Sequence, residues 1–348
     1  MAVSPTILVT GGTGFIGRHL VHQLLEAKTG VRLLCRSPDK AHALFGNSVE
    51  VVKGDVTSAE AARAACQDIS LVYHVAGLYR FGMRHRSALW NTNVEGTRNL
   101  LTAARQAGVK RFVHCSTAGI LAAKGRLITH LDFPRNPPRW CGYKISKWHA
   151  EQAALRAASE GQDVVIASPT APIGSGDDRP TPTGQMILDL MHNRFPACSK
   201  TGLNIVAVQD VARGLIALGN RGQPGRRYLL GHENLWLEDF LTQVAAQIGC
   251  AAPKAWVPWP LVAAGGLVGD AIGLLTGHGG ERLCWETAYY ARQEQFFDLS
   301  PTRHDTGWQA EKTLESAISE SVAWFASRSK SETPLPKQAA NRMEKNPS

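Results

Sequence analysis

Thr6-Ile-Leu-Val-Thr-Gly-Gly-Thr-Gly-Phe-Ile-Gly-Arg-His-Leu20 holds three structural signals in direct succession. Its first five residues are a short, mostly apolar run of the kind that a buried parallel strand needs. Gly11, Gly14 and Gly17 follow, and the residues after them take up helical spacing. In such a unit the three glycines allow a tight turn, a close approach of a ligand to the backbone, and close packing of helix on strand. The unpaired N–H groups at the start of the helix predict that this ligand carries phosphates.

Strand-like and helix-like segments alternate over the first half of the chain. After the glycine turn, short apolar runs recur at residues 31–35, 49–53, 71–76, 111–115 and 163–167. Helical segments lie between them, among them residues 87–107 and a helix that opens at Gly142. Alternation at this spacing is typical of βαβ units, so we expect an α/β fold with a doubly wound parallel sheet.

The residue after the second expected strand indicates which dinucleotide the glycine turn would bind. Folds specific for NAD(H) place Asp or Glu about twenty residues beyond the turn, where it holds the ribose 2′-hydroxyl. This chain has Arg36 there and Lys40 one helical turn later. Since a guanidinium pairs with a 2′-phosphate, the two residues favour NADP(H), with NAD(H) as the alternative. An exposed surface arginine would look the same in the sequence.

Two further strand ends carry candidate cofactor contacts. Asp55 closes the third expected strand, and it could accept a hydrogen bond from an adenine amino group or cap the helix from Ser58. Ala76 and a glycine end the fourth strand, where the backbone must pass close to a neighbour. Asp55, Val56 and Ala76 therefore join the expected cofactor site.

Tyr143 and Lys147 lie four residues apart in an expected helix, which places both side chains on one face. A tyrosine with its ordinary pKa of about 10 is a poor acid or base at neutral pH, and a nearby ammonium favours the phenolate. Thr117 follows the strand at 111–115 and would add a hydroxyl that polarises a substrate carbonyl. We expect Tyr143 to exchange a proton with the substrate, Lys147 to lower the pKa of Tyr143 and bind the cofactor ribose, and Thr117 to hold the substrate oxygen.

Other kinds of catalytic site lack their sequence signatures. The twelve histidines form no HExxH motif and do not pair with cysteines at metal-ligand spacing, so we expect no metal site. A GxSxG motif, typical of serine hydrolases, is also missing from the sequence.

The composition of the 348 residues is that of a globular protein, with 44% hydrophobic and 19% charged residues. Seven cysteines without a CxxC pair favour reduced thiols, and the N-terminus lacks the basic start of a signal peptide, so we expect a cytoplasmic protein. The net charge of +9 is compatible with anionic ligands, an acidic membrane surface or nucleic acid. Because no nucleic-acid motif accompanies it, we expect no nucleic-acid partner.

The alternation stops after residue 170, which predicts a change of architecture. We expect residues 1–170 to form the NADP-binding domain, with its sheet completed by segments within 203–231, and residues 171–328 to form mainly a substrate-binding lobe. Residues 174–184 are rich in Gly, Pro, Asp and Thr and predict a substrate-side loop. The polar, charged tail at 329–348 is expected to be disordered.

Residues 255–277 form an apolar stretch with several glycines and two prolines. Asp270 and the early prolines leave fewer continuous apolar residues than a membrane span needs. A buried or interfacial helix is expected instead, with one face formed by Leu261, Val268, Ile272 and Leu275. Peripheral membrane contact is therefore one expected interaction.

Five motifs together resemble the extended short-chain dehydrogenase/reductase (SDR) superfamily, or NAD-dependent epimerase/dehydratase superfamily: Thr10-Gly-Gly-Thr-Gly-Phe-Ile-Gly17, Gly54-Asp55, Asn93-Val-Glu-Gly-Thr97, Ser116-Thr117-Ala118 and Tyr143-Lys-Ile-Ser-Lys147. The resemblance covers residues 5–328 and looks closest to the dihydroflavonol-reductase-like branch. Three stretches, at 168–174, 179–184 and 201–204, are similar to hopanoid-associated sugar epimerases. The resemblance implies a Rossmann fold with a smaller C-terminal substrate-binding lobe. It also implies a homodimer formed through the helices at 87–107 and 143–160.

The resemblance also assigns roles to individual residues. The catalytic tyrosine and lysine of the family fall on Tyr143 and Lys147, and its Ser/Thr partner falls on Thr117. Because Ser116 precedes Thr117, either hydroxyl could face the substrate. The cofactor positions of the family fall on Gly11, Gly14 and Gly17 for the turn, Phe15 and Ile16 behind the pyrophosphate, Asp55 beside the adenine and Pro169 beside the nicotinamide.

These observations predict an NAD(P)-dependent oxidoreductase that transfers a hydride between nicotinamide and a carbonyl or alcohol carbon of a small-molecule substrate. A sugar or sugar-nucleotide epimerase that retains its cofactor would use the same residues; Arg36 favours the reductase, because NADPH is the reductant usually consumed. A non-catalytic NADP-binding sensor or scaffold is another alternative, although such proteins typically lack the tyrosine or the lysine. The apolar stretch at 255–277 and the positive charge also suggest an enzyme that tailors lipids or triterpenoids at a membrane.

Overall fold

The computed structural model describes residues 6–194, 197–253, 255–276 and 284–332. Its largest element is a seven-stranded parallel sheet in the order β10-β6-β5-β4-β1-β2-β3. Strand order runs outward from β1 in both directions, which confirms the predicted doubly wound α/β fold. The strands are β1 (Ile7–Thr10), β2 (Val31–Cys35), β3 (Glu50–Lys53), β4 (Leu71–His74), β5 (Arg111–Cys115), β6 (Val164–Pro169) and β10 (Arg227–Leu230).

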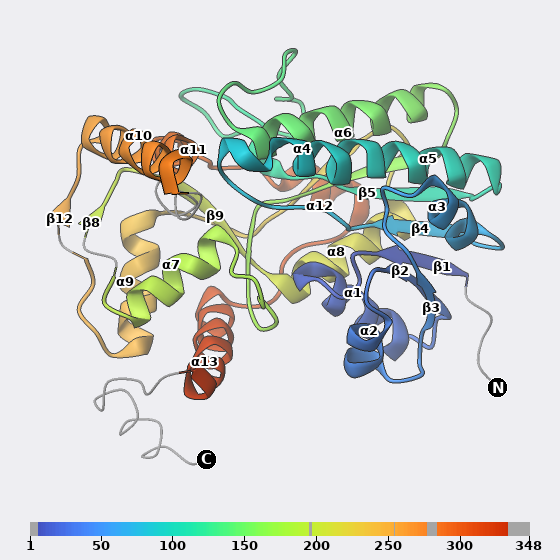
Figure 1. The fold of residues 1–348 in the computed structure, drawn as a ribbon, viewed down its shortest axis with the longest axis horizontal. Coiled ribbons are helices and arrows are strands. Elements are labelled where there is room, and N and C mark those ends of the chain that lie inside the picture. The colour runs from blue at the N-terminus through green and yellow to red at the C-terminus, as the bar shows by residue number, and fades with distance from the viewer. Residues whose placement is uncertain (1–5, 195–196, 254, 277–283, 333–348) are drawn as a thin grey trace.

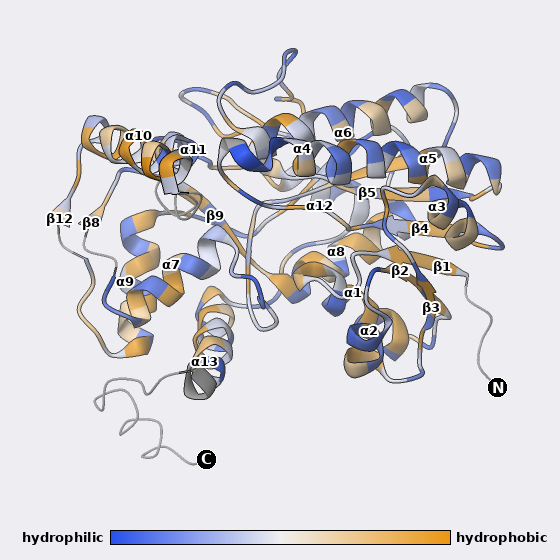
Figure 2. Cartoon of the chain, viewed as in Figure 1, coloured by the Kyte–Doolittle hydropathy of each residue, from blue (hydrophilic) through white to orange (hydrophobic). Residues whose placement is uncertain are grey.

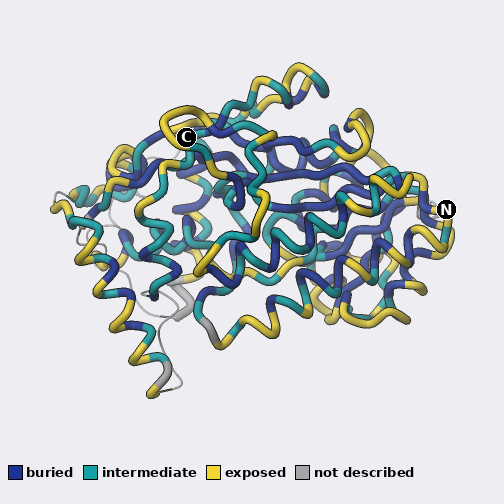
Figure 3. The backbone as a smooth tube through the Cα atoms, turned by 90° about the horizontal axis from the view of Figure 1, so that it is seen from above, coloured by how far each residue is buried: buried dark blue, intermediate teal, exposed yellow. Residues whose placement is uncertain are grey.

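Helices cover both faces of this sheet, as Figure 1 shows. One face carries α1 (Phe15–Glu26), α2 (Pro38–Phe45) and α8 (Val208–Arg221), and the other carries α3 (Ala59–Cys66), α5 (Gly96–Gln106) and α6 (Gly142–Ser159). Successive strand residues alternate between the two cores, so that Val9 packs beneath α1 while Leu8 packs against the opposite helices. Both faces are therefore apolar, and in Figure 3 the buried strands run through the middle of the molecule.

The helix predicted over residues 87–107 is interrupted. It consists of α4 (Arg86–Leu89), a π-helical segment η2 (Trp90–Glu95) and α5. A π-helical turn holds one more residue than an α-helical turn and changes which side chains face inward. Here Asn93 is 1% exposed, and its amide contacts the segment that follows β4.

A smaller lobe follows β6. Its three-stranded sheet has the order β11-β9-β7, made of β7 (Ala171–Ile173), β9 (Gly202–Ala207) and β11 (Glu233–Trp236). The second core lies between this sheet and α7 (Pro182–Met191), α9 (Leu237–Ile248) and α13 (Leu314–Glu332). Within residues 203–231, β10 joins the main sheet, whereas β9 belongs to the lobe. The helix α13 continues to Glu332, inside the tail for which disorder is predicted, and residues 333–348 lie outside the described part.

The remaining elements lie beside the lobe and the main sheet. They are η1 (Met83–His85), η3 (Ala118–Ile120), the two-stranded pair β8 (Ala197–Cys198) and β12 (Ala255–Trp256), α10 (Trp259–Thr276), α11 (Trp285–Tyr290) and α12 (Ser300–Thr306). The expected helix within 255–277 is α10, and its predicted apolar face is exposed, which leaves the interfacial alternative. Among the described residues, no helix combines the length and the apolar character needed to cross a membrane.

Candidate active site

The glycine turn between β1 and α1 is closed too tightly for side chains. Gly11 has a φ of +73°, and its carbonyl oxygen accepts a hydrogen bond of 2.9 Å from the Gly14 N–H. A Cβ on Gly17 would lie 2.1 Å from the Gly11 oxygen, and a Cβ on Gly11 would lie 2.6 Å from the backbone nitrogen of Ala76. Gly14 caps α1 without a side-chain hydrogen bond. The first turn of α1 therefore offers bare N–H groups beside a smooth backbone surface, which fits the pyrophosphate of a dinucleotide.

Arg36 and Asp55 face each other at the ends of β2 and β3. Their side chains lie 3.7 Å apart, and the Arg36 side chain is 73% exposed. Asp55 accepts hydrogen bonds from the backbone and hydroxyl of Thr57, while Ser58 caps α3 with its own hydroxyl. Asp55 is thus not the cap of α3, and its carboxylate lies within reach of a ligand that Arg36 could also contact.

The loop before α7 contacts α1 and α2. Asp178 forms ion pairs with Arg18, with Lys40 at 3.0 Å and with Arg328 at 2.7 Å. Burial would raise the pKa of Asp178, but the hydrogen bonds from Arg18 and Lys40 outweigh it and lower that pKa. We predicted a substrate-side loop at residues 174–184. The loop is shorter, because Thr181 caps α7 and the helix begins at Pro182. Within the loop, Asp178 forms its ion pairs with side chains of α1, α2 and α13.

The other expected cofactor residues line the same edge of the sheet. Phe15 and Ile16 open α1, and Pro169 is the buried last residue of β6. Val56 is 7% exposed and packs so closely on α5 that a Cβ on Gly96 would lie 2.7 Å from it. The carboxyl ends of parallel strands form the ligand-binding edge of such sheets, so all of these residues lie where a dinucleotide would bind.

Thr117, Tyr143 and Lys147 come together beyond the end of β5. The Thr117 hydroxyl lies close enough to the Tyr143 phenol to act on its pKa, and it accepts a hydrogen bond of 3.1 Å from the Gly119 N–H. The Lys147 ammonium donates a hydrogen bond of 2.7 Å to the carbonyl oxygen of Cys115, and its Nζ lies 4.0 Å from the position that a Cβ on Gly77 would take. Lys147 therefore lies between Tyr143 and the segment after β4, next to the glycine turn.

The second hydroxyl after β5 is used elsewhere. Ser116 is buried and donates a hydrogen bond to Glu151, which also forms a buried ion pair with Arg227. This network ties α6 to β5 and β10. Of the two candidates, Thr117 is therefore the hydroxyl that meets Tyr143.

Burial sets the protonation of this group. It raises the pKa of Tyr143 above its ordinary value, while the Thr117 hydroxyl opposes the rise. Burial also lowers the pKa of Lys147. We expected Lys147 to lower the pKa of Tyr143. The pKa is raised instead, because desolvation of the buried phenol dominates. In this geometry Tyr143 is a protonated phenol at neutral pH.

An aromatic wall, defined as Tyr79, Phe81 and Tyr290, lies over Tyr143. The Tyr79 ring centroid is 4.0 Å from that of Tyr143, and Phe81 packs on Tyr290 at 5.4 Å. Lys144 lies beside the wall, with its Nζ 3.9 Å from the centre of the Tyr290 ring, and burial lowers its pKa to about 8. The wall therefore places three aromatic rings beside Tyr143.

Comparison with known proteins agrees with this geometry. The model of the NAD dependent epimerase/dehydratase family matches residues 7–231. The chain belongs to this family. It is therefore an enzyme of the extended SDR type, which confirms the resemblance drawn from its motifs.

Full-length relatives are reductases and related enzymes. The chain is 35% identical to a putative dihydroflavonol 4-reductase of Synechocystis sp. over 93% of this chain and 96% of that protein. It is 29% identical to sterol demethylase protein B of Methylococcus capsulatus, over 93% and 99% of the two chains. Among solved structures, gox2253 superposes with a TM-score of 0.80 at 31% identity, covering 93% of this chain and 99% of that one.

Two residues that support α6, Glu286 and Asn93, were not among the predicted site residues. Glu286 of α11 accepts hydrogen bonds of 2.8 Å from the Gly142 N–H and 3.0 Å from the Gly82 N–H, so it caps the helix that presents Tyr143. Asn93 lies in the quoted Asn-Val-Glu-Gly-Thr motif, and its amide links the backbone of Leu78 to the Ser146 hydroxyl at 2.9 Å. Only the motif, and not the local pattern, could have pointed to Asn93.

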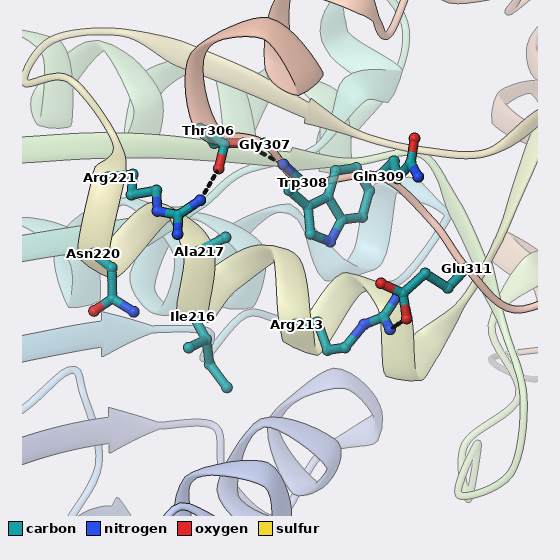
Figure 4. Close-up of a pocket in the computed structure, with 10 residues that line it drawn as sticks. All are labelled: Arg213, Ile216, Ala217, Asn220, Arg221, Thr306, Gly307, Trp308, Gln309 and Glu311. Atoms are coloured by element: carbon teal, nitrogen blue, oxygen red, sulfur yellow. Dashed lines mark hydrogen bonds and ion pairs between the residues drawn. The ribbon is translucent and has the colours of Figure 1, made fainter.

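A surface pocket of about 290 Å³ lies apart from this site. Figure 4 shows its lining, which comes from α8 and residues 306–311 and includes the Arg213–Glu311 ion pair. None of its lining residues belongs to the glycine turn, to the Tyr143 group or to the aromatic wall. This pocket is therefore separate from the candidate site, which lies at the sheet edge beside the glycine turn and Tyr143.

Proposed function

We propose that this enzyme reduces a carbonyl group of an apolar small molecule with NADPH. The observation that carries the proposal is the grouping of the Thr117 hydroxyl with the Tyr143 phenol, and of Lys147 one helical turn away, at the sheet edge that holds the glycine turn. In reduction, the carbonyl oxygen of the substrate accepts the hydrogen bond of Thr117 and then the proton of Tyr143. When bound, nicotinamide supplies the hydride at its C4 atom to the carbonyl carbon.

The protonation state of Tyr143 is compatible with reduction. Reduction needs a proton donor, and burial keeps the Tyr143 phenol protonated at neutral pH, while the same rise in pKa makes it a weaker acid. Oxidation of an alcohol would need the phenolate, which burial disfavours. Lys147 would hold the ribose of the cofactor.

The basic residues support NADP(H) as the dinucleotide. Arg36 is largely exposed at the end of β2, and Lys40 lies one turn into α2. A 2′-phosphate bound there would be paired with a guanidinium and an ammonium. Asp55 would remain beside the adenine.

The aromatic wall supports an apolar, ring-containing substrate. Tyr79, Phe81 and Tyr290 offer ring faces and edges for contact with a substrate. Lys144 is the buried cation beside them, and its ammonium already contacts the Tyr290 ring, so it is not free to pair with an anionic group of a substrate. The names of two relatives are compatible with this, since one is a putative dihydroflavonol 4-reductase and the other a sterol demethylase protein.

Cofactor-retaining epimerisation is the second candidate, because the family model is that of epimerases and dehydratases. The test is NADPH consumption by the purified protein with a panel of cyclic ketones and of nucleotide sugars. A reductase oxidises one NADPH per product, whereas an epimerase interconverts sugars with no net change. The variant Tyr143→Phe tests the proton donor in the same assay. Its matched control is Tyr228→Phe, because that change removes the hydroxyl of a buried tyrosine in β10, outside the site. Sugar turnover without NADPH oxidation would contradict the proposal.

A further inference from the structure

Helix α10 directs its large apolar side chains away from the protein. Its buried side has small residues, with Ala263 7% exposed and Gly266 so close to α11 that a Cβ would lie 2.7 Å from the Cys284 carbonyl oxygen. The opposite side exposes five large apolar side chains, here called the α10 face: Leu261, Leu267, Val268, Ile272 and Leu275, which are 50–87% exposed. A helix that belongs to a water-exposed surface has the reverse arrangement.

The α10 face is continuous with an exposed tryptophan. Trp256 of β12 is 63% exposed and lies three residues before α10 begins. Figure 2 shows α10 as a mostly hydrophobic helix at the edge of the molecule, beside α11. Tryptophan prefers the boundary between water and hydrocarbon, because its ring is apolar and its N–H is polar.

Two exposed cations, Arg292 and Lys200, lie near this surface. Arg292 is exposed and stacks on Trp259, the first residue of α10, at 4.9 Å. Lys200 is 68% exposed and follows the strand that pairs with Trp256; it lies 3.9 Å from Glu294.

The acidic groups of α10 and α11 face inward. Asp270 accepts a hydrogen bond of 2.9 Å from the Trp285 N–H, and Glu286 is 4% exposed. The chain as a whole carries a net charge of +9. Arg292 and Lys200 are therefore exposed at this end of the molecule, with the exposed Glu294 beside Lys200, while the carboxylates of the two helices accept hydrogen bonds from backbone N–H groups.

We propose that the α10 face and Trp256 dock onto the surface of an anionic lipid bilayer. The 18 residues of α10 extend about 27 Å. Because its small-residue side is packed on α11, the helix lies along the surface, with the α10 face among the acyl chains and Arg292 and Lys200 near the lipid phosphates.

The docked orientation places the candidate site near the bilayer. The helix α11, on which α10 packs, carries Glu286 beneath the start of α6 and Tyr290 in the aromatic wall. An apolar ketone dissolved in the membrane would thus reach Tyr143 over a short path. Docking itself is independent of the proposed function; only this supply of substrate rests on it.

Co-sedimentation of the full-length protein with vesicles tests the docking. The wild type is expected to sediment with vesicles of phosphatidylcholine and phosphatidylglycerol, more weakly with phosphatidylcholine alone, and less in high salt. A Val268→Ser, Leu275→Ser double variant should bind at least about tenfold more weakly, because it removes apolar area from the contact. The matched control is Leu127→Ser, Leu131→Ser, which removes two exposed leucines outside α10.

Several results would overturn the proposal. A wild type that stays in the supernatant, or a double variant that binds like the wild type and the control, excludes docking through this face. Analytical ultracentrifugation covers the case of a second copy: a dimer that the double variant dissociates, with no change in vesicle binding, assigns the face to self-association. Leu275→Ser alone is the safeguard against misfolding, since that side chain is 87% exposed, and it should still weaken binding. NADPH binding by each variant separates a failure of docking from a failure of the proposed function.

Discussion

Replacing Gly17 by alanine perturbs the glycine turn at its tightest point. The new Cβ would lie 2.1 Å from the Gly11 carbonyl oxygen, 2.7 Å from the Gly11 carbonyl carbon and 2.8 Å from the Gly12 Cα. These are backbone atoms, so helix and turn must separate by about 1.3 Å before the oxygen reaches the 3.4 Å of ordinary contact. Overpacking of this kind costs roughly 1–3 kcal/mol of folding free energy. The same movement displaces the N–H groups that would hold the phosphates.

Isothermal titration of the purified Gly17→Ala variant with NADPH measures the consequence. We expect binding at least about tenfold weaker than in the wild type, which corresponds to roughly 1.4 kcal/mol. Gly108→Ala is the control, because Gly108 has a φ of +69° with nothing within 4 Å of the added Cβ. It should lose about 1–2 kcal/mol of stability through backbone strain and keep its NADPH affinity. A Gly17→Ala protein that binds NADPH like the wild type would refute the interpretation of the turn as a phosphate cradle.

Three further predictions concern the proton donor, its support and the pH dependence of stability. Tyr143→Phe should lower kcat for carbonyl reduction by roughly 10²–10⁴-fold with little change in NADPH affinity, which steady-state kinetics and binding titration measure. In the wild type, the rate of reduction should stay level through neutral pH, while the rate of alcohol oxidation rises with pH. Glu286→Gln removes one of two accepted hydrogen bonds and the negative charge at the start of α6, so it should cost about 1–3 kcal/mol in urea unfolding and lower kcat more than NADPH affinity; an unchanged kcat would contradict its positioning role. Asp177 is 3% exposed, and burial raises its pKa from 3.8 to about 6. Because the folded state then binds a proton more tightly than the unfolded state, Asp177 should cost the wild type up to roughly 3 kcal/mol of stability as the pH rises from 4 to above 6, a loss that Asp177→Asn should not show.

Much of the sheet could be predicted because buried parallel strands read as short apolar runs. The runs at 31–35 and 111–115 match β2 and β5 residue for residue, and the helix that carries Tyr143 begins at Gly142 as predicted. The glycine spacing predicted the turn, because only residues without a Cβ fit between β1, α1 and Ala76. These features depend on neighbours in the sequence.

The features that could not be predicted depend on contacts between distant residues. Glu286 caps α6 across 144 positions, and Asp178 meets Arg18 across 160 positions, so no local pattern announces either pair. The π-helical segment at Trp90–Glu95 has no distinct sequence pattern. Within it, Asn93 faces inward and its amide donates a hydrogen bond to the Leu78 carbonyl oxygen, a contact between residues 15 positions apart. The pKa of Tyr143 likewise depends on burial beside the aromatic wall, whose residues come from two distant parts of the chain.

The central claim is that this sheet edge binds NADPH and that Arg36 reads its 2′-phosphate. Equilibrium binding of NADPH and NADH to the wild type, to Arg36→Asp and to Arg303→Asp tests it most directly. Arg303 is an exposed arginine of α12, so its replacement makes the same change of charge outside the glycine turn. The account predicts that the wild type and the control prefer NADPH by at least about tenfold and that Arg36→Asp loses the preference. Equal affinity of the wild type for both cofactors, or tighter binding of NADH, would contradict the assignment of Arg36 and favour a cofactor-retaining epimerase.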